Sequence, residues 1–302
     1  MLTIFLIILV VPLFLLTTLA LTRQTSLFQF ILLALTFGLA LLFMWVSMPW
    51  DVVSIYYRWL IPWLYLAALV IGYRRIGTAR QPPPKWAKAL GVLVNVPMSI
   101  LFAALCWACF TGYPAPANAI KLASPLQDGR FVISHGGASP LINGHFRVAP
   151  QTYALDILGV NAWGARSHIF GDATKLENYA IFGTPIIAPC SGTVLIAADG
   201  LPDLKPGQTD RDNLAGNHVV LACFDSEIVL AHMLSGSVFV EESQPVNTGD
   251  YLGRVGNSGN TSEPHLHMHA ERGGEDGEIL NGEGVPILID GRFLVRGDLI
   301  SP

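Results

Sequence analysis

Residues 264–270 read Pro-His-Leu-His-Met-His-Ala and hold the side chains best suited to chemistry. Because side chains two positions apart on a β-strand face the same side, a strand here brings His265 and His267 together, and His269 can follow them. Two neutral imidazoles on one face can bind zinc or act as a catalytic pair. The alternative is a row of solvated polar side chains on an exposed strand, and this segment alone leaves both open.

Two further polar residues lie in apolar surroundings. Asp156 follows Tyr-Ala-Leu inside an apolar run, and His232 follows the run Ile-Val-Leu-Ala. An unpaired carboxylate is costly to bury, so Asp156 must have a cation or hydrogen-bond donors beside it. A metal ion is one candidate, and a structural role as hydrogen-bond acceptor is the other. For His232 the alternative is an edge histidine with a satisfied hydrogen bond.

Taken together, these segments resemble the lysostaphin-like zinc metallopeptidases, which are peptidoglycan endopeptidases with a folded β-sheet core. The resemblance covers about residues 150–270 and rests on the order and spacing of several motifs. The motifs are Tyr-Ala-Leu-Asp-Ile at 153–157, 183–194, Gly-Asn-His-Val-Val at 216–220, Leu-Ala-His at 230–232, 246–255, and Gly-Asn-Ser-Gly-Asn-Thr-Ser-Glu-Pro-His-Leu-His at 256–267.

The resemblance implies roles for four residues. Asp156 and His267 match zinc ligands of the family, and His232 and His265 match its catalytic histidines that do not bind the metal. It also implies the reaction, in which zinc-activated water hydrolyses a peptide bond and one of the two histidines is the general base. The implied substrate is a stem peptide or peptide cross-link of bacterial peptidoglycan.

One position departs from the family pattern. The family's first motif is His-x-x-x-Asp, and the residue four positions before Asp156 is Thr152, a poor zinc ligand. A catalytic zinc site needs three protein ligands and one open position. The nearest upstream imidazole is His145, so we predict that His145 folds back to complete the site. The alternatives are that Gln151 lines the site without binding the metal, or that the metal site is weakened.

The remaining histidines are candidates by residue type alone. They are His135, His168 and His218. We expect these three, and also His269, to lie outside the catalytic group. His218 directly follows Asn217 in an expected strand, so it should face away from the cleft or line its edge.

Residues 130–302 are expected to form an all-β domain with a folded sheet, of the β-roll or barrel-sandwich type. Short apolar runs alternate with clusters of Gly, Pro, Asn and Asp, and no sustained helical period is present. Glycines at tight corners between β-branched residues suit a small folded-over sheet. The expected strands lie near 130–134, 153–158, 185–188, 192–197, 218–223, 227–232, 237–240, 251–255 and 265–270.

The 302-residue chain divides by composition near residue 112. Its mean hydropathy of +0.48 is too high for an ordinary soluble protein. Only 13% of its residues are charged, about half the usual share. The first part holds seven basic side chains and one acidic one, whereas the rest holds eleven basic and twenty-one acidic ones. We expect a membrane region over 1–111, a linker over 112–129 and the peptidase-like domain over 130–302. The acidic balance of that domain argues against nucleic-acid binding, which needs clustered Lys and Arg.

Four apolar stretches each come near the roughly 20 residues that cross a bilayer as a helix. They are 1–21, 27–48, 55–73 and 89–111. The connection 74–88 carries five basic side chains, so the positive-inside rule predicts that it is cytoplasmic. The last span then delivers the domain to the periplasmic or extracellular side of the cytoplasmic membrane, as an integral, multi-pass protein. Any protein partner of the membrane region stays unknown.

The four cysteines form two pairs by position. Cys190 and Cys223 would lie in an oxidising compartment, and antiparallel pairing of their strands can join them in a disulfide; two buried thiols are the alternative. Cys106 and Cys109 share one helix face in the last span. Packing by small side chains is favoured there over a metal or redox pair.

Two other functions compete with a zinc endopeptidase. A catalytically weak or inactive protein on the same fold would bind cell wall or activate another wall hydrolase, and only Thr152 favours this. Segments 183–194 and 246–256 also resemble the glucose-specific phosphocarrier domain and biotinyl-type barrels. A phosphocarrier should face the cytoplasm, whereas the expected topology places the domain on the other side.

Overall fold

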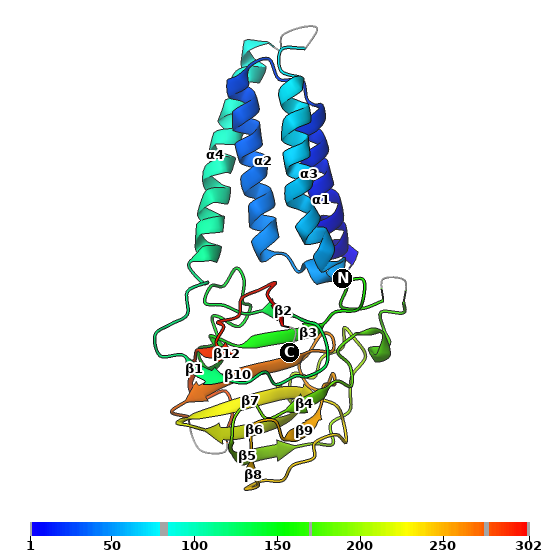
Figure 1. The fold of residues 1–302 in the computed structure, drawn as a ribbon, viewed down its shortest axis with the longest axis vertical. Helices are drawn as coiled ribbons and strands as arrows, with labels where there is room; N and C mark the ends of the chain where they lie inside the picture. Colours follow the sequence, from blue (N-terminus) through cyan, green and yellow to red (C-terminus); the bar gives the residue numbers. More distant parts are fainter. Residues whose placement is uncertain (1, 79–83, 169–170, 275–277, 301–302) are drawn as a thin grey trace. The chain divides into compact units, whose positions relative to one another are not determined.

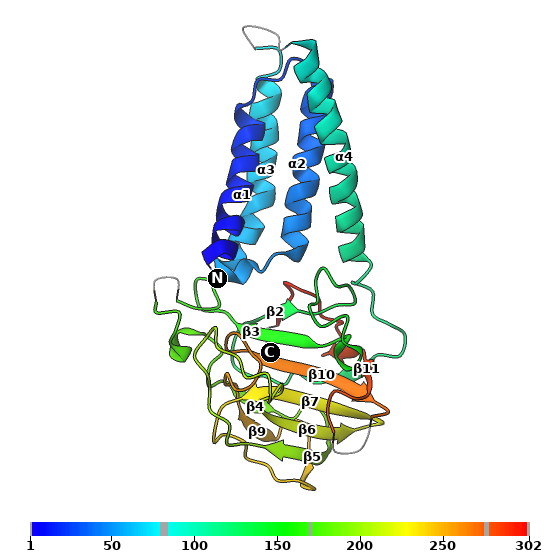
Figure 2. The ribbon, with the colours of Figure 1, turned by 180° about the vertical axis from the view of Figure 1, so that it is seen from behind.

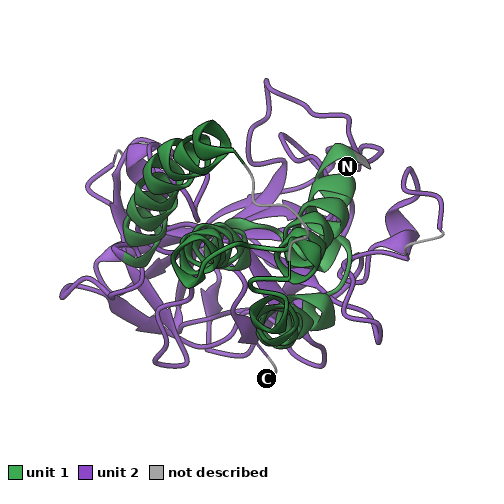
Figure 3. Cartoon of the chain, turned by 90° about the horizontal axis from the view of Figure 1, so that it is seen from above, with its two compact units in different colours: residues 1–110 green, residues 111–302 purple. Residues whose placement is uncertain are grey.

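The computed structural model describes residues 2–78, 84–168, 171–274 and 278–300. The chain divides into two compact units, Met1–Phe110 and Thr111–Pro302 (Figure 3). In the described residues, long helices make up the first unit, and strands with short 3-10 turns make up the second.

Four apolar helices form the first unit (Figure 1). They are α1 (Leu2–Leu21), α2 (Leu27–Ser47), α3 (Ile55–Arg74) and α4 (Lys85–Phe110), with the 3-10 turn η1 (Trp50–Val52) between α2 and α3. All four are long and apolar enough to cross a membrane, as the sequence predicts. α4 begins before the apolar stretch expected at 89–111, because its polar first turn with Lys85 and Lys88 is also helical.

Polar side chains join the helices inside this apolar unit. The Tyr65 hydroxyl on α3 donates to the carbonyl oxygen of Ala34 on α2 over 2.7 Å. The hydroxyl groups of Thr36 on α2 and Ser99 on α4 share a hydrogen bond of 2.8 Å. Hydrogen bonds between helices help to fix which helix faces pair where the surroundings are apolar.

The second unit is built on one large antiparallel sheet with the strand order β13-β2-β3-β10-β7-β6-β5-β8, and β11 pairs with β10 beside this path (Figures 1 and 2). Its strands are β2 (Phe131–His135), β3 (Leu155–Gly159), β5 (Gly192–Ala198), β6 (Asn217–Cys223), β7 (Ser226–Met233), β8 (Pro245–Val246), β10 (Leu266–Arg272), β11 (Glu283–Val285) and β13 (Leu299–Ile300). The order brings β3, β10 and β7 side by side, although they are far apart in the sequence.

Two small strand pairs complete the second unit. β4 (Pro185–Ile187) pairs with β9 (Tyr251–Arg254) antiparallel, and β1 (Ile120–Leu122) pairs with β12 (Ile287–Ile289) parallel. Side chains from both pairs join those of one face of the large sheet in a single buried cluster. The short 3-10 turns η2 (Ala149–Gln151) and η3 (Leu176–Asn178) lie in the connections. The predicted class, a folded all-β domain after apolar helices, is confirmed.

Two local expectations differ from the structure. β1 lies inside the stretch 112–129 that was expected as a linker, and Leu122 and Leu126 there are buried in the core cluster. The apolar pattern in this stretch is too short to be told from a linker by sequence. Over 237–240 no strand forms; there the backbone N–H of Val238 donates to the Asp199 carboxylate over 3.2 Å.

Alternation along β10 sorts its side chains between the two faces of the sheet. Leu266 and Met268 are buried in the core cluster, so His267 and His269 lie on the opposite face. The register pairs His267 with Asp156 on β3, whose neighbours in sequence also face the core. The sheet therefore places the carboxylate and the imidazoles on one face.

Candidate active site and metal centre

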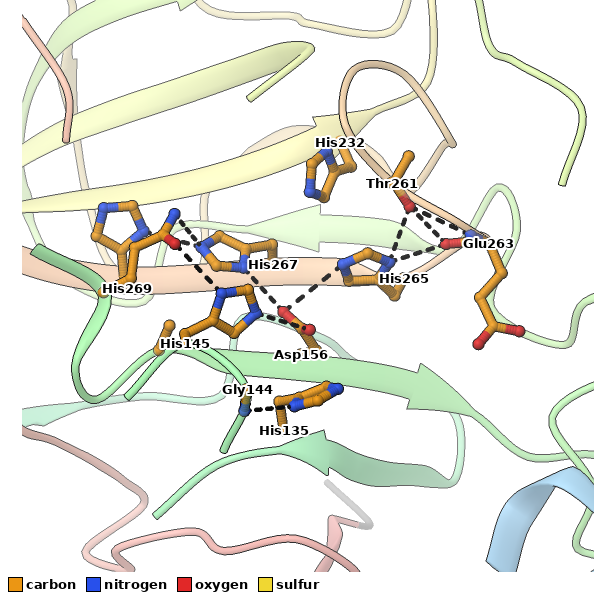
Figure 4. A network of polar contacts seen from close by, with 12 residues as sticks. His135, Gly144, His145, Asp156, His232, Thr261, Glu263, His265, His267 and His269 are labelled. Atoms are coloured by element: carbon orange, nitrogen blue, oxygen red, sulfur yellow. Dashed lines mark hydrogen bonds and ion pairs between the residues drawn. The ribbon is translucent and has the colours of Figure 1, made fainter. Parts of the chain in front are cut away.

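Asp156 is the point at which the polar side chains of the site meet (Figure 4). Its Oδ2 lies 2.9 Å from His145 Nε2, and its Oδ1 lies 2.8 Å from His267 Nδ1. His265 Nε2 lies 3.6 Å from the same Oδ1. Asp156 is 8% exposed, so these imidazoles are the partners that a buried carboxylate requires.

The loop after β2 folds back and brings His145 to Asp156. Asn143, fully buried, holds this loop: its side-chain amide donates to the carbonyl oxygens of Gly137 and Ala154 over 3.0 and 3.1 Å. Its Oδ1 accepts the backbone N–H of His145 over 3.0 Å. The position of His145 is thus fixed by buried hydrogen bonds on both sides of the loop.

His145, Asp156 and His267 form a group that could hold a metal ion. One ligand atom from each, two imidazole nitrogens and one carboxylate oxygen, lies within 4.8 Å of the others. Two nitrogens and one oxygen make a donor set that suits catalytic zinc, with room for an open position. The chemistry of these residues therefore fits the metal that the sequence resemblance implies. His232, His265 and His267 satisfy the same distance criterion as a second grouping.

Thr152 does not take part in this group. Its hydroxyl donates to the backbone carbonyl oxygens of Val148 and Ala149 over 3.3 and 2.9 Å, and the residue is half-buried. Gln151, the neighbouring residue, lies beside the group instead. Its Oε1 is 3.2 Å from His145 Nδ1, and because a carbonyl oxygen only accepts, His145 carries its proton on Nδ1. His145 Nε2 lies on the side of Asp156, where it can donate a hydrogen bond when protonated and can bind a metal when it carries no proton.

His232 and His265 lie next to each other on the other side of His267. The centroids of their rings are 4.8 Å apart. His232 Nδ1–H donates to the carbonyl oxygen of Ser258 over 2.9 Å, and His265 Nδ1–H donates to that of Glu263 over 2.8 Å. When such a ring is neutral with its proton on Nδ1, its Nε2 keeps a lone pair that can accept a proton.

The backbone of His232 is in the left-handed region, with φ of 62°. This conformation is uncommon for a residue with a side chain and costs on the order of 1–3 kcal/mol. Two hydrogen bonds hold it: the N–H of His232 donates to Ala215 O over 2.9 Å, and its carbonyl oxygen accepts from Gly256 over 3.0 Å. The strain is retained at the residue whose ring faces His265.

Electrostatics differ between the acid and the imidazoles. Burial alone would raise the pKa of Asp156, but His145 and His265, together with hydrogen bonds from His145 and His267, hold that pKa well below its usual range. Burial lowers the pKa of His267 to about 3 and that of His232 well below the usual range. Burial would lower the pKa of His145 too, but Asp156 reverses the effect and raises it. The site thus pairs an ionised carboxylate with neutral His232 and His267.

The other histidines divide between the site and its surroundings. His218 donates from Nδ1 to Gly216 O over 2.7 Å, and His168 is exposed; neither belongs to the two groupings of possible metal ligands among the described residues. His135 accepts the Gly144 N–H over 2.7 Å and lies behind His145, with ring centroids 5.6 Å apart. His269 differs from expectation: it is 1% exposed, and its Nδ1 lies 3.0 Å from His267 Nε2. The sequence signal for this proximity is the position of His269, two residues after His267 on the same strand.

A cavity of about 340 Å³ opens beside these groups. His145, His232 and His267 line one part of it, and Leu214, Val229 and Ile279 line another. A cleft with polar groups gathered at one place and apolar walls elsewhere is typical of sites that bind small molecules or short peptide segments.

Residues 176–279 match the model of Peptidase family M23. The second unit therefore contains a segment similar to M23 peptidases, and it is called the M23 domain below. The predicted resemblance to the lysostaphin-like metallopeptidases is thereby confirmed. The matched segment contains His232, His265 and His267, whereas His145 and Asp156 precede it.

Solved structures similar to the M23 domain include a protein from Pseudomonas aeruginosa described as an M23 peptidase, with 22% identity and a TM-score of 0.29 over 53% of this chain and 48% of that one. The catalytic domain of lysostaphin from Staphylococcus simulans has 20% sequence identity and a TM-score of 0.28, over 47% of this chain and 78% of that one. A zinc-containing peptidase from Vibrio cholerae has 16% sequence identity and a TM-score of 0.28, over 63% of this chain and 41% of that one. This chain spans about half the length of the Pseudomonas protein. No curated protein matches it.

Proposed function

We propose that the M23 domain is a zinc-dependent endopeptidase that hydrolyses peptide bonds of bacterial cell-wall peptidoglycan. The helical unit would anchor it in the cytoplasmic membrane, with the domain on the periplasmic or extracellular side. The convergence of His145 Nε2, Asp156 and His267 Nδ1, beside His232 and His265, is the observation that carries the proposal. The family match supports the substrate class.

Three residues would hold the metal: His145, Asp156 and His267. Gln151 supports this by accepting the Nδ1 proton of His145, which leaves the lone pair of Nε2 directed at Asp156. A bound zinc ion supplies a Lewis acid that polarises the scissile carbonyl and lowers the pKa of water toward neutrality.

His232 and His265 would move the protons of the reaction. Their Nδ1–H groups are committed to the carbonyl oxygens of Ser258 and Glu263, so only Nε2 of each can exchange a proton with substrate or water. One Nε2 accepts a proton from the attacking water. The other, protonated before the reaction, would donate a hydrogen bond to the oxygen on which charge builds up and then pass its proton to the leaving amine. One proton is thus taken up and one released in each turnover.

Two features support the outer side of the membrane for the domain. The structure joins Cys190 and Cys223 in a disulfide, which is typical of proteins in oxidising compartments. Residues 74–88, from the end of α3 to the first turn of α4, carry five basic side chains, so the positive-inside rule favours the cytoplasmic side for them. α4 then runs outward and ends where the M23 domain begins.

Replacing His145 tests the proposal, with Thr152→Ala as the matched control. We expect the purified wild-type protein to bind one zinc ion and to digest purified peptidoglycan. His145→Ala should lose most of its zinc and its activity, because two ligands remain. Thr152→Ala should keep both, since the hydroxyl that it removes bonds only to carbonyl oxygens of its own turn. Metal analysis of the three proteins decides the matter, and full zinc retention in His145→Ala would sink the assignment.

A catalytically inactive protein of the same fold is the second candidate, favoured by Thr152 at the position where the family has a ligand. It would bind cell wall or activate another hydrolase. Zinc content together with digestion of purified wall material separates the two, because the inactive protein would release no fragments even when loaded with zinc.

A further inference from the structure

β10 carries two buried polar side chains, His269 and Glu271, besides the proposed ligand His267. His267, His269 and Glu271 occur at every second position, so they project from the same face of the strand. They are 3%, 1% and 1% exposed. Burying a histidine and a carboxylate away from solvent is costly unless they are paired, so their placement behind His267 calls for a role.

The three side chains form a row. His267 Nε2 lies 3.0 Å from His269 Nδ1, and His269 Nε2 lies 3.7 Å from Glu271 Oε1. The Glu271 carboxylate accepts the backbone N–H groups of Leu280 and Gly282 over 2.9 and 3.0 Å. These bonds and His269 hold the pKa of Glu271 below its usual value, although burial would raise it. An ionised carboxylate therefore lies at the end of the row.

The proton on His267 decides whether its Nδ1 can bind a metal. Nδ1 faces Asp156 Oδ1 at 2.8 Å, so it must be free of its proton to act as a ligand. The proton of the neutral ring is then on Nε2 and needs an acceptor. His269 Nδ1 is that acceptor, and His269 in turn keeps its own proton on Nε2, facing Glu271.

One neighbour favours the opposite arrangement. Gln151 Nε2 is 3.4 Å from His267 Nε2, and an amide nitrogen can only donate. Gln151 therefore favours a lone pair on His267 Nε2, with the proton on Nδ1. Its contact is longer than the 3.0 Å contact to His269. The charge of Glu271, acting through His269, opposes Gln151.

We propose that His269 and Glu271 are positioning residues that hold His267 in the tautomer with Nδ1 free to bind the metal. The inference rests on the proposed zinc site. It adds a buried imidazole and carboxylate, 3.7 Å apart, that orient one ligand, as partners behind metal-binding histidines commonly do. Neither residue is one of the three proposed metal ligands.

Two substitutions at position 269 test whether His269 acts as a hydrogen-bond acceptor for His267 or only fills space. His269→Leu fills the space without an acceptor, whereas the amide oxygen of His269→Gln can accept the proton of His267 Nε2. We expect zinc affinity of the full-length protein in detergent, measured by competition with a chromophoric chelator, to fall about 10–100-fold in His269→Leu. His269→Gln should recover most of it. His218→Leu, which changes a histidine outside the group, should bind like the wild type.

A measurement on the wild-type protein does not depend on any variant folding. Long-range 15N–1H spectra of histidine-labelled, zinc-loaded protein should show His267 with its proton on Nε2 and His269 with its proton also on Nε2. A proton on Nδ1 of His269, or equal zinc affinity for His269→Leu and the wild type, would overturn the positioning role alone. A wild-type protein that binds no zinc would overturn the proposed function as well.

Discussion

His232 and His265 differ from the three proposed ligands in what their ring nitrogens contact. Each donates from Nδ1 to a backbone carbonyl oxygen, so Nε2 is the nitrogen left for proton exchange. His232 lines the cavity, and His265 Nε2 lies 3.6 Å from Asp156 Oδ1. A ring fixed in this way can exchange a proton at one defined atom. At the scale of single residues, proton transfer and metal binding should therefore be separable by substitution.

His265→Ala tests that separation. The variant should keep its zinc, because its ring is 3.6 Å from Asp156 Oδ1 and the three ligands remain. Its turnover on purified peptidoglycan should fall by about 10²–10⁴-fold, the usual contribution of a general acid or base. Zinc content and initial rate measured on the same preparation check both halves, with His218→Ala as the control. Activity at the wild-type level would refute the role of His265.

The sequence indicates most of the residues in the site but few of their contacts. Asp156 and His267 follow from a carboxylate in an apolar strand and an His-x-His motif. The sequence indicates His145 only because a zinc site needs a third protein ligand and this is the nearest upstream histidine. The structure places it against Asp156. The burial of His269 could not be predicted, because a histidine at the next alternate position of a strand looks the same whether that end of the strand is covered or open.

The loop that carries His145 is the least regular element of the site, and its shape depends on Asn143. This side chain bonds to both ends of the loop, through Gly137 O and Ala154 O, and to the backbone of His145 itself. A strand could not bring His145 to Asp156, which lies on β3 only eleven residues later. At the scale of elements, we therefore expect zinc affinity to fall when this loop loses the hydrogen bonds of Asn143.

Asn143→Ala should weaken zinc binding at least tenfold while leaving the sheet folded. The substitution leaves two buried carbonyl groups without their donor, at a cost of about 1–3 kcal/mol each, and this cost falls on the loop. Chelator competition measures the affinity, and far-UV circular dichroism reports the sheet. Unchanged affinity with an intact sheet would show that other contacts place His145.

The strands were predicted where apolar runs are long and bounded by turn residues, as in β6 and β7. β1 was not, since three residues give too little alternation and its partner β12 lies far along the chain. The disulfide between Cys190 and Cys223 was one of two open alternatives, because it depends on how β5 and β6 pair. Local pattern thus predicts strands better than it predicts pairing.

The two units of the molecule have compositions suited to different solvents. The helices of the first unit expose large apolar side chains along much of their length, among them Phe14, Phe28, Trp63 and Trp107. The second unit is acidic and closes its apolar side chains into one core. At the scale of the whole molecule, this division supports an integral membrane protein with its M23 domain in water.

The side on which that domain lies can be measured directly. Protease added to spheroplasts should degrade the M23 domain, whereas an epitope inserted in the basic connection 74–88 should be reached only after the membrane is permeabilised. A cytoplasmic reporter protein that stays intact controls for leakage. Protection of the domain in intact spheroplasts would contradict the proposed topology and, with it, access to the cell wall.

The central claim is that His145, rather than a residue four before Asp156, completes a zinc site with Asp156 and His267. Anomalous scattering at the zinc edge, from crystals of the zinc-loaded protein, tests it most directly. The account predicts one peak at about 2.0–2.2 Å from His145 Nε2, an Asp156 oxygen and His267 Nδ1. A peak bound by His232 and His265 without His145, or no peak from a zinc-saturated crystal, would contradict it.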